Sequence, residues 1–111
     1  MHPIDGYSNW LEIDLGAVAG NVRRLSRLTG GPVMAVVKAN GYGHGMIEVA
    51  RAARAAGAHS LGVARLDEAL ELRAAGVTAP VLVLGALPEG RWQEALVADV
   101  SASVWSREQV R

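Results

Sequence analysis

A short internal repeat, two copies of the tetrapeptide Arg-Ala-Ala-Gly, bears on what this chain can fold into. The copies occupy residues 54–57 and 73–76, so the period is 73 − 54 = 19 residues. Each copy ends an alanine-rich segment and precedes a short aliphatic run. A helix followed by a strand at about this spacing is the building block of a (β/α) barrel or of a doubly wound sheet.

Four short runs of aliphatic and β-branched residues predict the strands. They cover residues 33–37, 61–64, 81–84 and 100–104. The first three are almost continuously apolar, which is typical of parallel strands that are covered on both faces. The sequence therefore predicts a parallel sheet flanked by helices. We favour a barrel over a doubly wound sheet, but this pattern alone does not decide between them.

Four helices are predicted around these strands. They cover residues 16–29, 46–56, 67–75 and a segment that Pro88 and Glu89 open. In the first of them, apolar residues recur every three or four positions. Gly57 and Gly76 are expected to end the second and third helices in a left-handed conformation.

Composition excludes several classes of protein. The chain has 111 residues, which is one domain or part of one, and its eleven basic and eleven acidic residues cancel. We therefore expect no nucleic-acid partner and no membrane partner. The chain has no cysteine and therefore neither a disulfide nor a thiolate metal site. Because the first residues resemble no secretion signal and no apolar run reaches about 18 residues, a cytoplasmic location is expected.

One segment carries the features of a chemical site, and Lys38 is its centre. This lysine follows the apolar run 33–37. Poor solvation at the end of such a strand favours the neutral form of an amine, which is the form that attacks a carbonyl cofactor to make a Schiff base. The carboxyl ends of strands also face the active site in parallel (β/α) folds. The alternative is that Lys38 simply extends to solvent at a strand end.

A glycine-rich loop follows the lysine. Gly41, Gly43 and Gly45 permit positive φ and close approach of a ligand, and Tyr42 adds a hydroxyl donor. Free N–H groups at the start of the next helix would favour a phosphate. The alternative is a flexible connection with a packing tyrosine, and the spacing does not match the dinucleotide pattern G-x-G-x-x-G.

The whole segment Val-Val-Lys-Ala-Asn-Gly-Tyr-Gly-His-Gly, residues 36–45, resembles the cofactor-attachment motif of bacterial alanine racemases. The resemblance extends to Trp-Leu-Glu-Ile-Asp-Leu at residues 10–15, to residues 63–73 and to Pro-Val-Leu-Val-Leu-Gly at residues 80–85. It therefore runs from about residue 10 to the end of the chain, with the register kept.

The resemblance implies a cofactor, pyridoxal 5'-phosphate (PLP), and roles for four residues. Lys38 matches the lysine that holds PLP covalently and then acts as a base on one face of the substrate α-carbon. Tyr42 matches the tyrosine that hydrogen-bonds the phosphate. Leu84 and Val36 match positions near the cofactor ring, although both fit equally well as plain barrel core. Racemisation needs a second acid/base group, which in the family is a tyrosine from the partner subunit, so a homodimer is implied.

The implied fold class is α/β, namely the first half of a (β/α)₈ barrel, with residues 1–9 as a tail and residues 10–111 as a partial PLP-binding barrel domain. Eight strands and about 250 residues close such a barrel. The four predicted strands leave it open, and the C-terminal β domain of the family is absent. We therefore expect a fragment that is inactive by itself. The implied activity of the complete enzyme is interconversion of L-alanine and D-alanine, which supplies D-alanine for peptidoglycan.

Other polar and aromatic residues are expected to be structural. His44 is assigned a structural role at the helix start, and His2 and His59 are placed on the surface, so no metal site is expected. Asp67 and Glu68 suit the positive end of a helix dipole. Asp14 is likewise not taken as an acid/base group, and Trp92 and Trp105 are interpreted as packing anchors.

Three alternatives stay open at this stage. The first is a PLP enzyme with another substrate or reaction, such as a serine racemase or a barrel decarboxylase. The second is a PLP-binding barrel protein without catalytic activity. The third is a structural module that assembles with another chain.

Overall fold

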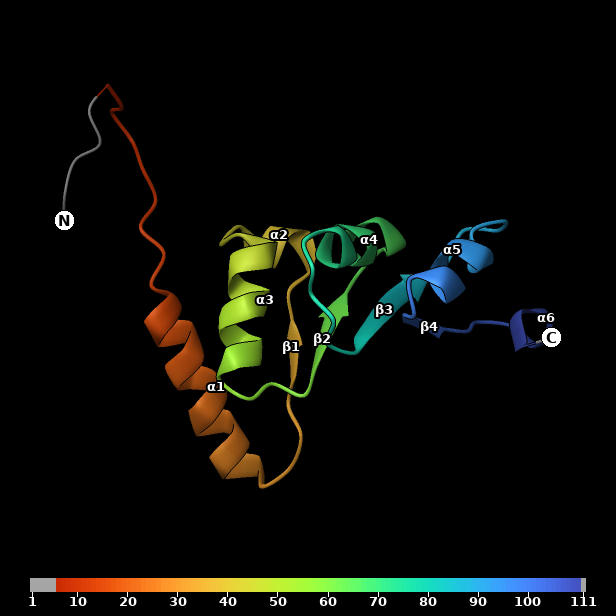
Figure 1. The fold of residues 1–111 in the computed structure, drawn as a ribbon, viewed down its shortest axis with the longest axis horizontal. Helices are drawn as coiled ribbons and strands as arrows, with labels where there is room; N and C mark the ends of the chain where they lie inside the picture. Colours follow the sequence, from red (N-terminus) through yellow and green to blue (C-terminus); the bar gives the residue numbers. More distant parts are fainter. Residues whose placement is uncertain (1–5, 111) are drawn as a thin grey trace.

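Helices and strands alternate along the chain. The structure is a computed structural model that describes residues 6–110. The elements are α1 (Leu15–Thr29), β1 (Met34–Val36), α2 (Lys38–Tyr42), α3 (Met46–Ala55), β2 (Ser60–Val63), α4 (Leu66–Ala74), β3 (Val81–Ala86), α5 (Trp92–Val97), β4 (Ser101–Ser103) and α6 (Arg107–Val110). Residues 6–14 form no helix or strand and run away from the sheet (Figure 1).

The four strands form one parallel sheet in the order β1-β2-β3-β4. Ala35 pairs with Leu61, Leu61 with Val81, and Leu82 with Ser101. Each new strand is therefore added at the same edge. In a doubly wound sheet the strand order reverses at a switch point, whereas in a barrel it follows the chain. The observed order is that of the predicted partial barrel.

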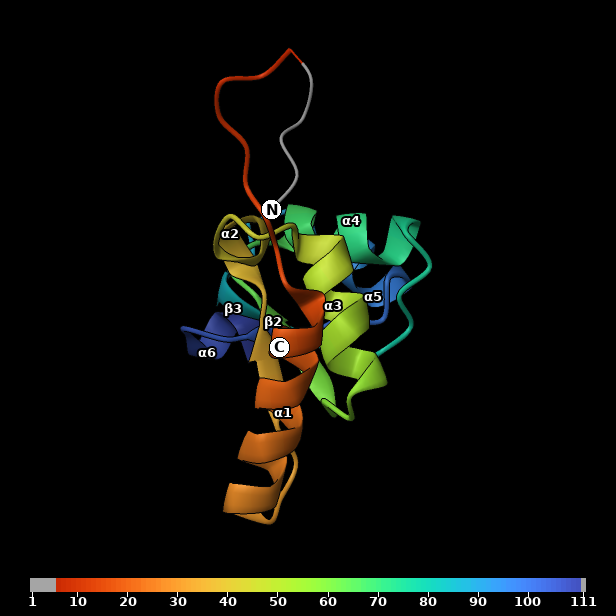
Figure 2. The ribbon, with the colours of Figure 1, turned by 90° about the vertical axis from the view of Figure 1, so that its left-hand side faces the viewer.

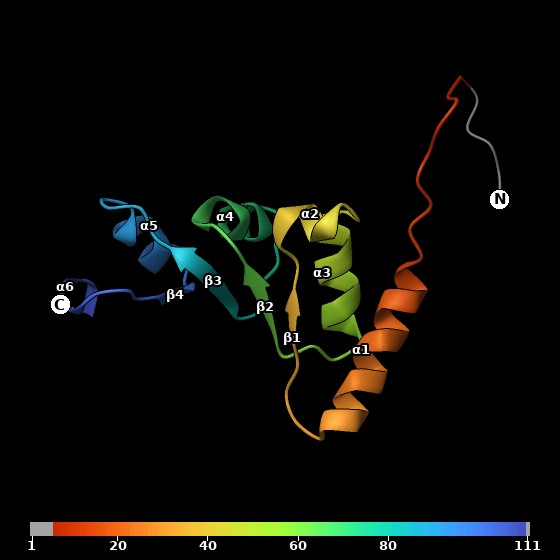
Figure 3. The same cartoon turned by 180° about the vertical axis from the view of Figure 1, so that it is seen from behind.

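The helices α3, α4 and α5 lie on one side of the sheet (Figure 2), and the view from behind shows the strands uncovered (Figure 3). The core lies between these helices and the strands. Its largest fully buried side chains are Leu61, Leu66, Leu72, Val37, Val63, Val81 and Val83. At about 25 cal/mol per Å² of apolar surface, burial of this layer is the main force that holds the helices on the sheet.

The prediction that the first three strands are covered on both faces is correct only for β2. Every residue of β2 is buried, whereas Met34 and Val36 of β1 are exposed on the side that the helices leave free. The reason lies in residue size, because β2 carries Gly62 on the open face and the side chains of Val36 and Leu84 from its two neighbours lie against it.

The Arg-Ala-Ala-Gly repeat is explained by two equivalent arginines. Arg54 donates from Nη1 to the carbonyl of Ala58 at 2.8 Å, and Arg73 donates from Nη1 to the carbonyl of Val77, also at 2.8 Å. Both arginines therefore hold the loop that leads into the next strand. The glycines after them, Gly57 and Gly76, have φ of 105° and 84°, as predicted.

Most predicted boundaries are correct within two residues, and two details differ. The helix expected from Pro88 begins at Trp92, because Pro88 instead accepts the N–H of Arg91 in a turn. Trp92 packs against the core as predicted, but Trp105 is 69% exposed and is no packing anchor. His59 is exposed as predicted. His2 and part of the predicted tail 1–9 lie outside the described residues.

Among residues 6–110 no helix combines the length and the apolar character that a bilayer crossing requires.

Candidate functional site

Lys38 stands where β1 ends and the chain turns toward α3. It is half-buried, and it is the only lysine among the 111 residues. The residue before it, Val37, is fully buried in the core and donates its N–H to the carbonyl of Gly62 at 2.8 Å. The parallel ladder thus continues past β1 and fixes the backbone beside the lysine.

The segment after Lys38 is a left-handed turn, which the sequence did not predict. Its members Ala39, Asn40, Gly41 and Tyr42 have φ between 53° and 64°, and Gly43 follows at 85°. This conformation costs about 1–2 kcal/mol for each residue other than glycine, and less for asparagine. The predicted glycine-rich loop is therefore a defined structure and not a flexible connection.

Hydrogen bonds from outside the turn hold it in place. The side chain of Asn40 accepts the N–H of Met46 at 3.0 Å and so caps α3. The carboxylate of Glu68 accepts the N–H of Ala39 at 2.8 Å. Gly41 is buried against α3, and a Cβ added to it would lie 3.3 Å from backbone atoms of Met46. Strained backbone of this kind persists only where the surroundings restrain it strongly.

Beside this turn, the open face of the sheet carries an apolar floor that consists of Val36, Gly62 and Leu84. A Cβ added to Gly62 would lie 3.4 Å from Val36 Cγ2 and 3.6 Å from Leu84 Cδ1. The structure thus brings Val36 and Leu84, which the sequence analysis singled out, to opposite sides of one glycine. Each of the two side chains is 37% exposed. Their exposure fits a surface that receives a flat apolar group.

Tyr42 lies at the end of the left-handed turn and is 58% exposed. Its hydroxyl is therefore available as a donor. The start of α3, which the sequence suggested as a phosphate site, is less suited to that role. Asn40 already accepts the N–H of Met46, and the carboxylate of Glu48 lies over Gly45, where a Cβ would be 2.8 Å from its Oε2.

His44 has the structural role that the sequence predicted. Its Nδ1 lies 3.0 Å from the carbonyl oxygen of Tyr42 and 3.2 Å from that of Gly41. It therefore closes the turn through main-chain contacts. Within the part of the chain that the structure describes, no three histidine or carboxylate side chains gather as metal ligands would.

Asp67 and Glu68, at the start of α4, differ in their contacts. Asp67 Oδ1 lies 2.8 Å from Nη2 of Arg91. The hydrogen bond and the positive charge of Arg91 hold the pKa of Asp67 below its ordinary value of 3.8. Glu68 is buried and accepts the N–H of Arg65 at 3.0 Å, so it serves the helix start as expected.

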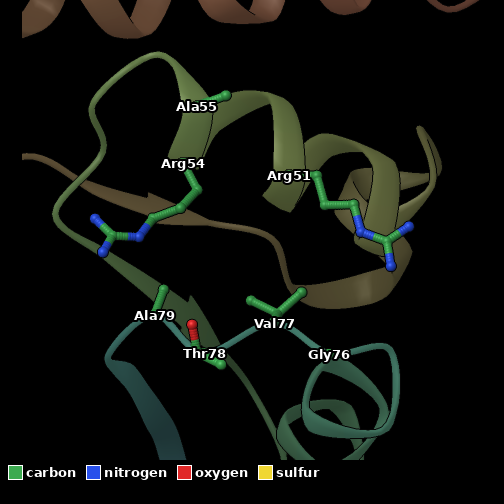
Figure 4. A pocket seen from close by; sticks show the side chains of 7 residues that line it. All are labelled: Arg51, Arg54, Ala55, Gly76, Val77, Thr78 and Ala79. Atoms are coloured by element: carbon green, nitrogen blue, oxygen red, sulfur yellow. The ribbon is translucent and has the colours of Figure 1, made fainter.

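A hollow of about 270 Å³ lies at the end of the sheet where the strands begin, opposite to Lys38. It is formed between the end of α3 and the loop before β3 (Figure 4). Arg51 and Arg54 line it, and their guanidinium groups point apart (Figure 4). Each donates to main-chain carbonyls, Arg51 to Ala75 at 2.7 Å and Arg54 to Ala58. The two guanidinium groups therefore do not converge on a common ligand. The candidate site is the other end of the sheet, where the strands end and Lys38 lies.

Comparison with known proteins places this geometry in a family. The sequence pattern of the family described as "Alanine racemase, N-terminal domain" matches residues 13–111. The alanine racemase of Desulfosudis oleivorans is 56% identical over 93 residues, which are 82% of this chain and 24% of that protein. The alanine racemase of Mycobacterium avium is 54% identical over 99 residues, 88% of this chain and 26% of that protein.

Solved structures agree. The crystal structure of alanine racemase from Bacillus anthracis with bound L-Ala-P aligns with a TM-score of 0.86 at 46% identity, over 91% of this chain and 27% of that one. The chain spans about a quarter of the length of the curated relatives that it matches. The fold is therefore a partial (β/α) barrel as predicted, and the chain belongs to the family of the alanine racemase N-terminal domain.

Proposed function

We propose that this chain is the lysine-bearing part of a PLP-dependent alanine racemase, which interconverts L-alanine and D-alanine. The observation that carries the proposal is the position of its single lysine. Lys38 follows the fully buried Val37, and next to it lie a left-handed turn and an apolar floor. The curated relatives, which are alanine racemases, support the choice of reaction.

The residues at this edge fit PLP in three respects. The amine of Lys38 suits an aldehyde cofactor. The floor of Val36, Gly62 and Leu84 suits a flat ring, because glycine leaves room between two apolar side chains. The exposed hydroxyl of Tyr42 suits a phosphate oxygen. When bound, PLP supplies the electron sink that makes the α-proton of an amino acid removable.

Each residue of the candidate site then has its own role. Lys38 holds the cofactor and, once released, accepts or donates the proton on one face of the substrate α-carbon. Val36 and Leu84 exclude water from below the ring, and Tyr42 orients the phosphate. A racemase needs a second acid/base group on the other face, which we assign to the partner subunit of a homodimer. We further infer a cytoplasmic enzyme that supplies D-alanine for peptidoglycan.

Borohydride labelling tests the proposal directly. The natural protein, at its full natural length, is incubated with PLP and reduced with borohydride. It is then digested, and mass spectrometry identifies the peptide that carries the pyridoxyl group. We expect the pyridoxyl group on Lys38, and no label on this segment in Lys38→Ala. Because the 111 residues contain no other lysine, the peptide assignment within them is unambiguous. A label confined to other parts of the natural protein would overturn the assignment of Lys38.

The substrate is tested separately. L-alanine and L-serine are each incubated with the natural protein and PLP, and the products are resolved by chiral chromatography. We expect D-alanine to form, and to form faster than D-serine. Labelling of Lys38 without racemisation of any amino acid would support a PLP-binding protein and contradict the racemase.

A further inference from the structure

Glu68 makes more hydrogen bonds than a helix cap requires. Its side chain comes from the first turn of α4, and the residue is 8% exposed. Oε1 accepts the N–H of Ala64 at 2.8 Å and that of Arg65 at 3.0 Å, and Oε2 accepts the N–H of Ala39 at 2.8 Å. One buried carboxylate thus receives three main-chain donors.

Two of these donors directly precede α4, and the third lies elsewhere. The N–H groups of Ala64 and Arg65 lie where β2 passes into α4, and Arg65 is the residue that caps the helix start. Oε1 alone satisfies them. Ala39 lies 29 residues earlier, in the left-handed turn. Oε2 therefore has no role in capping. It connects the turn after β1 to the start of α4.

The connection falls directly beside Lys38. The N–H of Ala39 lies in the same rigid peptide plane as the carbonyl of Lys38, so holding that N–H fixes ψ of Lys38. On the other side, the N–H of Val37 is bound to Gly62. Glu68 therefore holds the peptide that follows Lys38, and Gly62 holds the peptide that precedes Val37. The strain of Ala39, at φ 53°, makes such restraint necessary.

We propose that Glu68 is a positioning residue for Lys38, which holds the peptide after the lysine so that its amine meets the PLP aldehyde in a fixed orientation. The inference rests on the proposed function, since it assigns Glu68 to the same site. It gives Glu68 no contact with the cofactor.

Replacing Glu68 by glutamine separates the two capping bonds from the bond to Ala39. An ionised carboxylate offers acceptors on both oxygens, whereas an amide has one oxygen and one NH₂ group. With its oxygen toward Ala64 and Arg65, the amide keeps both capping bonds. Its NH₂ group then faces the N–H of Ala39, so donor meets donor. E68Q is therefore expected to release the turn and to preserve the cap.

The test compares E68Q with E71Q in the natural protein. Glu71 lies on the same helix, is exposed, and makes no side-chain hydrogen bond within residues 6–110. Amide hydrogen exchange of Ala39 is measured without PLP, and the rate of borohydride-fixed label at Lys38 is measured with PLP. Because bonds to charged acceptors are the strong ones, we expect both the exchange rate to rise and the labelling rate to fall by about tenfold in E68Q. E71Q is expected to match the natural protein.

Two further variants complete the test, V77A as a control for stability and E68D as a test of side-chain length. V77A removes two methyl groups from a buried residue far from the turn and is expected to lower the melting temperature without slowing the label. E68D keeps the charge but is one methylene shorter, so it cannot span both the helix start and Ala39. Because Ala64 and Arg65 are its near neighbours in the chain, it is expected to keep the cap, lose Ala39 and slow labelling like E68Q.

The outcomes separate the two proposals. Absence of label on Lys38 in the natural protein overturns the proposed function, while the exchange of Ala39 still tests the contact of Glu68. If the natural protein is labelled and E68Q matches E71Q in both measurements, the positioning role is wrong. It is also wrong if V77A slows labelling as much as E68Q at an equal loss of melting temperature.

Discussion

Val36 and Leu84 lie on two strands that do not touch each other, and their side chains approach the same glycine of the strand between them. A Cβ on Gly62 would be 3.4 Å from Val36 and 3.6 Å from Leu84, and 3.0 Å from Sδ of Met34. The floor beside Lys38 therefore has a shallow depression that only glycine provides. Any side chain at position 62 would fill it.

Gly62→Val is expected to impair cofactor uptake more than folding. The nearest atom, Met34 Sδ, ends a flexible exposed side chain that moves easily, so overpacking costs about 1–2 kcal/mol. The valine would raise the floor, and we expect the labelling of Lys38 by PLP and borohydride to slow several-fold. Gly31→Val is the control, because Gly31 has nothing within 4 Å. Equal labelling of the two variants would contradict the role of the floor.

Gly41→Ala is expected to destabilise the protein by about 2–4 kcal/mol, because it combines strain at positive φ with a contact to rigid backbone. Gly41 has φ 64°, and its added Cβ would lie 3.3 Å from Met46 Cα. Gly43→Ala shares the positive φ but meets no atom within 4 Å, so it isolates the strain, about 1–2 kcal/mol. Urea unfolding followed by tryptophan fluorescence measures both. Equal losses would show that the steric contact has no effect.

The two repeat arginines are expected to differ in their contribution to stability. Arg73 donates to the carbonyls of Ala98, Val77, Ala79 and Asp99 at 2.8–3.0 Å. Arg54 donates to two carbonyls, at 2.8 and 3.4 Å. We expect Arg73→Ala to lower the free energy of unfolding by about 2–3 kcal/mol and Arg54→Ala by about 1 kcal/mol. The same urea measurement checks the order, and a larger loss for Arg54 would contradict it.

Asp67 is expected to titrate below 3.8, because Arg91 stabilises its charged form. A carboxyl group with a lowered pKa stabilises the folded state above its unfolded pKa, and this contribution disappears as the pH falls through the folded pKa. The carbon NMR shift of the carboxyl group in an acid titration measures the midpoint. Arg91→Gln should raise it toward 3.8, with a small change in stability because the pair is exposed. A midpoint that Arg91→Gln leaves unchanged would refute the pairing.

Local patterns were enough to predict the four strands and the helices α1, α3 and α4. The apolar periodicity of α1, the repeat at residues 54–57 and 73–76, and Gly57 and Gly76 each reflect interactions within one unit. The left-handed turn was missed because local preference opposes it. Alanine and tyrosine rarely adopt positive φ, and Ala39 and Tyr42 do so here because tertiary contacts overcome the preference.

The candidate site was predictable to a similar degree. Lys38 was singled out by its place after an apolar run, Tyr42 by its place in the glycine-rich loop, and Val36 and Leu84 by the family resemblance. Glu68 was assigned to the start of α4, which its bond to Arg65 bears out. Its second partner, Ala39, lies 29 residues away in sequence, and no short-range pattern encodes that contact. Gly62 was passed over because a glycine inside a strand gives no chemical signal.

The order of the strands also has a consequence for folding during synthesis on the ribosome. Every strand pairs with the one synthesised just before it: Leu61 with Ala35 after 61 − 35 = 26 residues, Val81 with Leu61 after 20, and Ser101 with Leu82 after 19. Loops this short close quickly, and domains emerge from the N-terminus first. The sheet is thus suited to assembling vectorially, with β1 and β2 joined while later strands are still being translated.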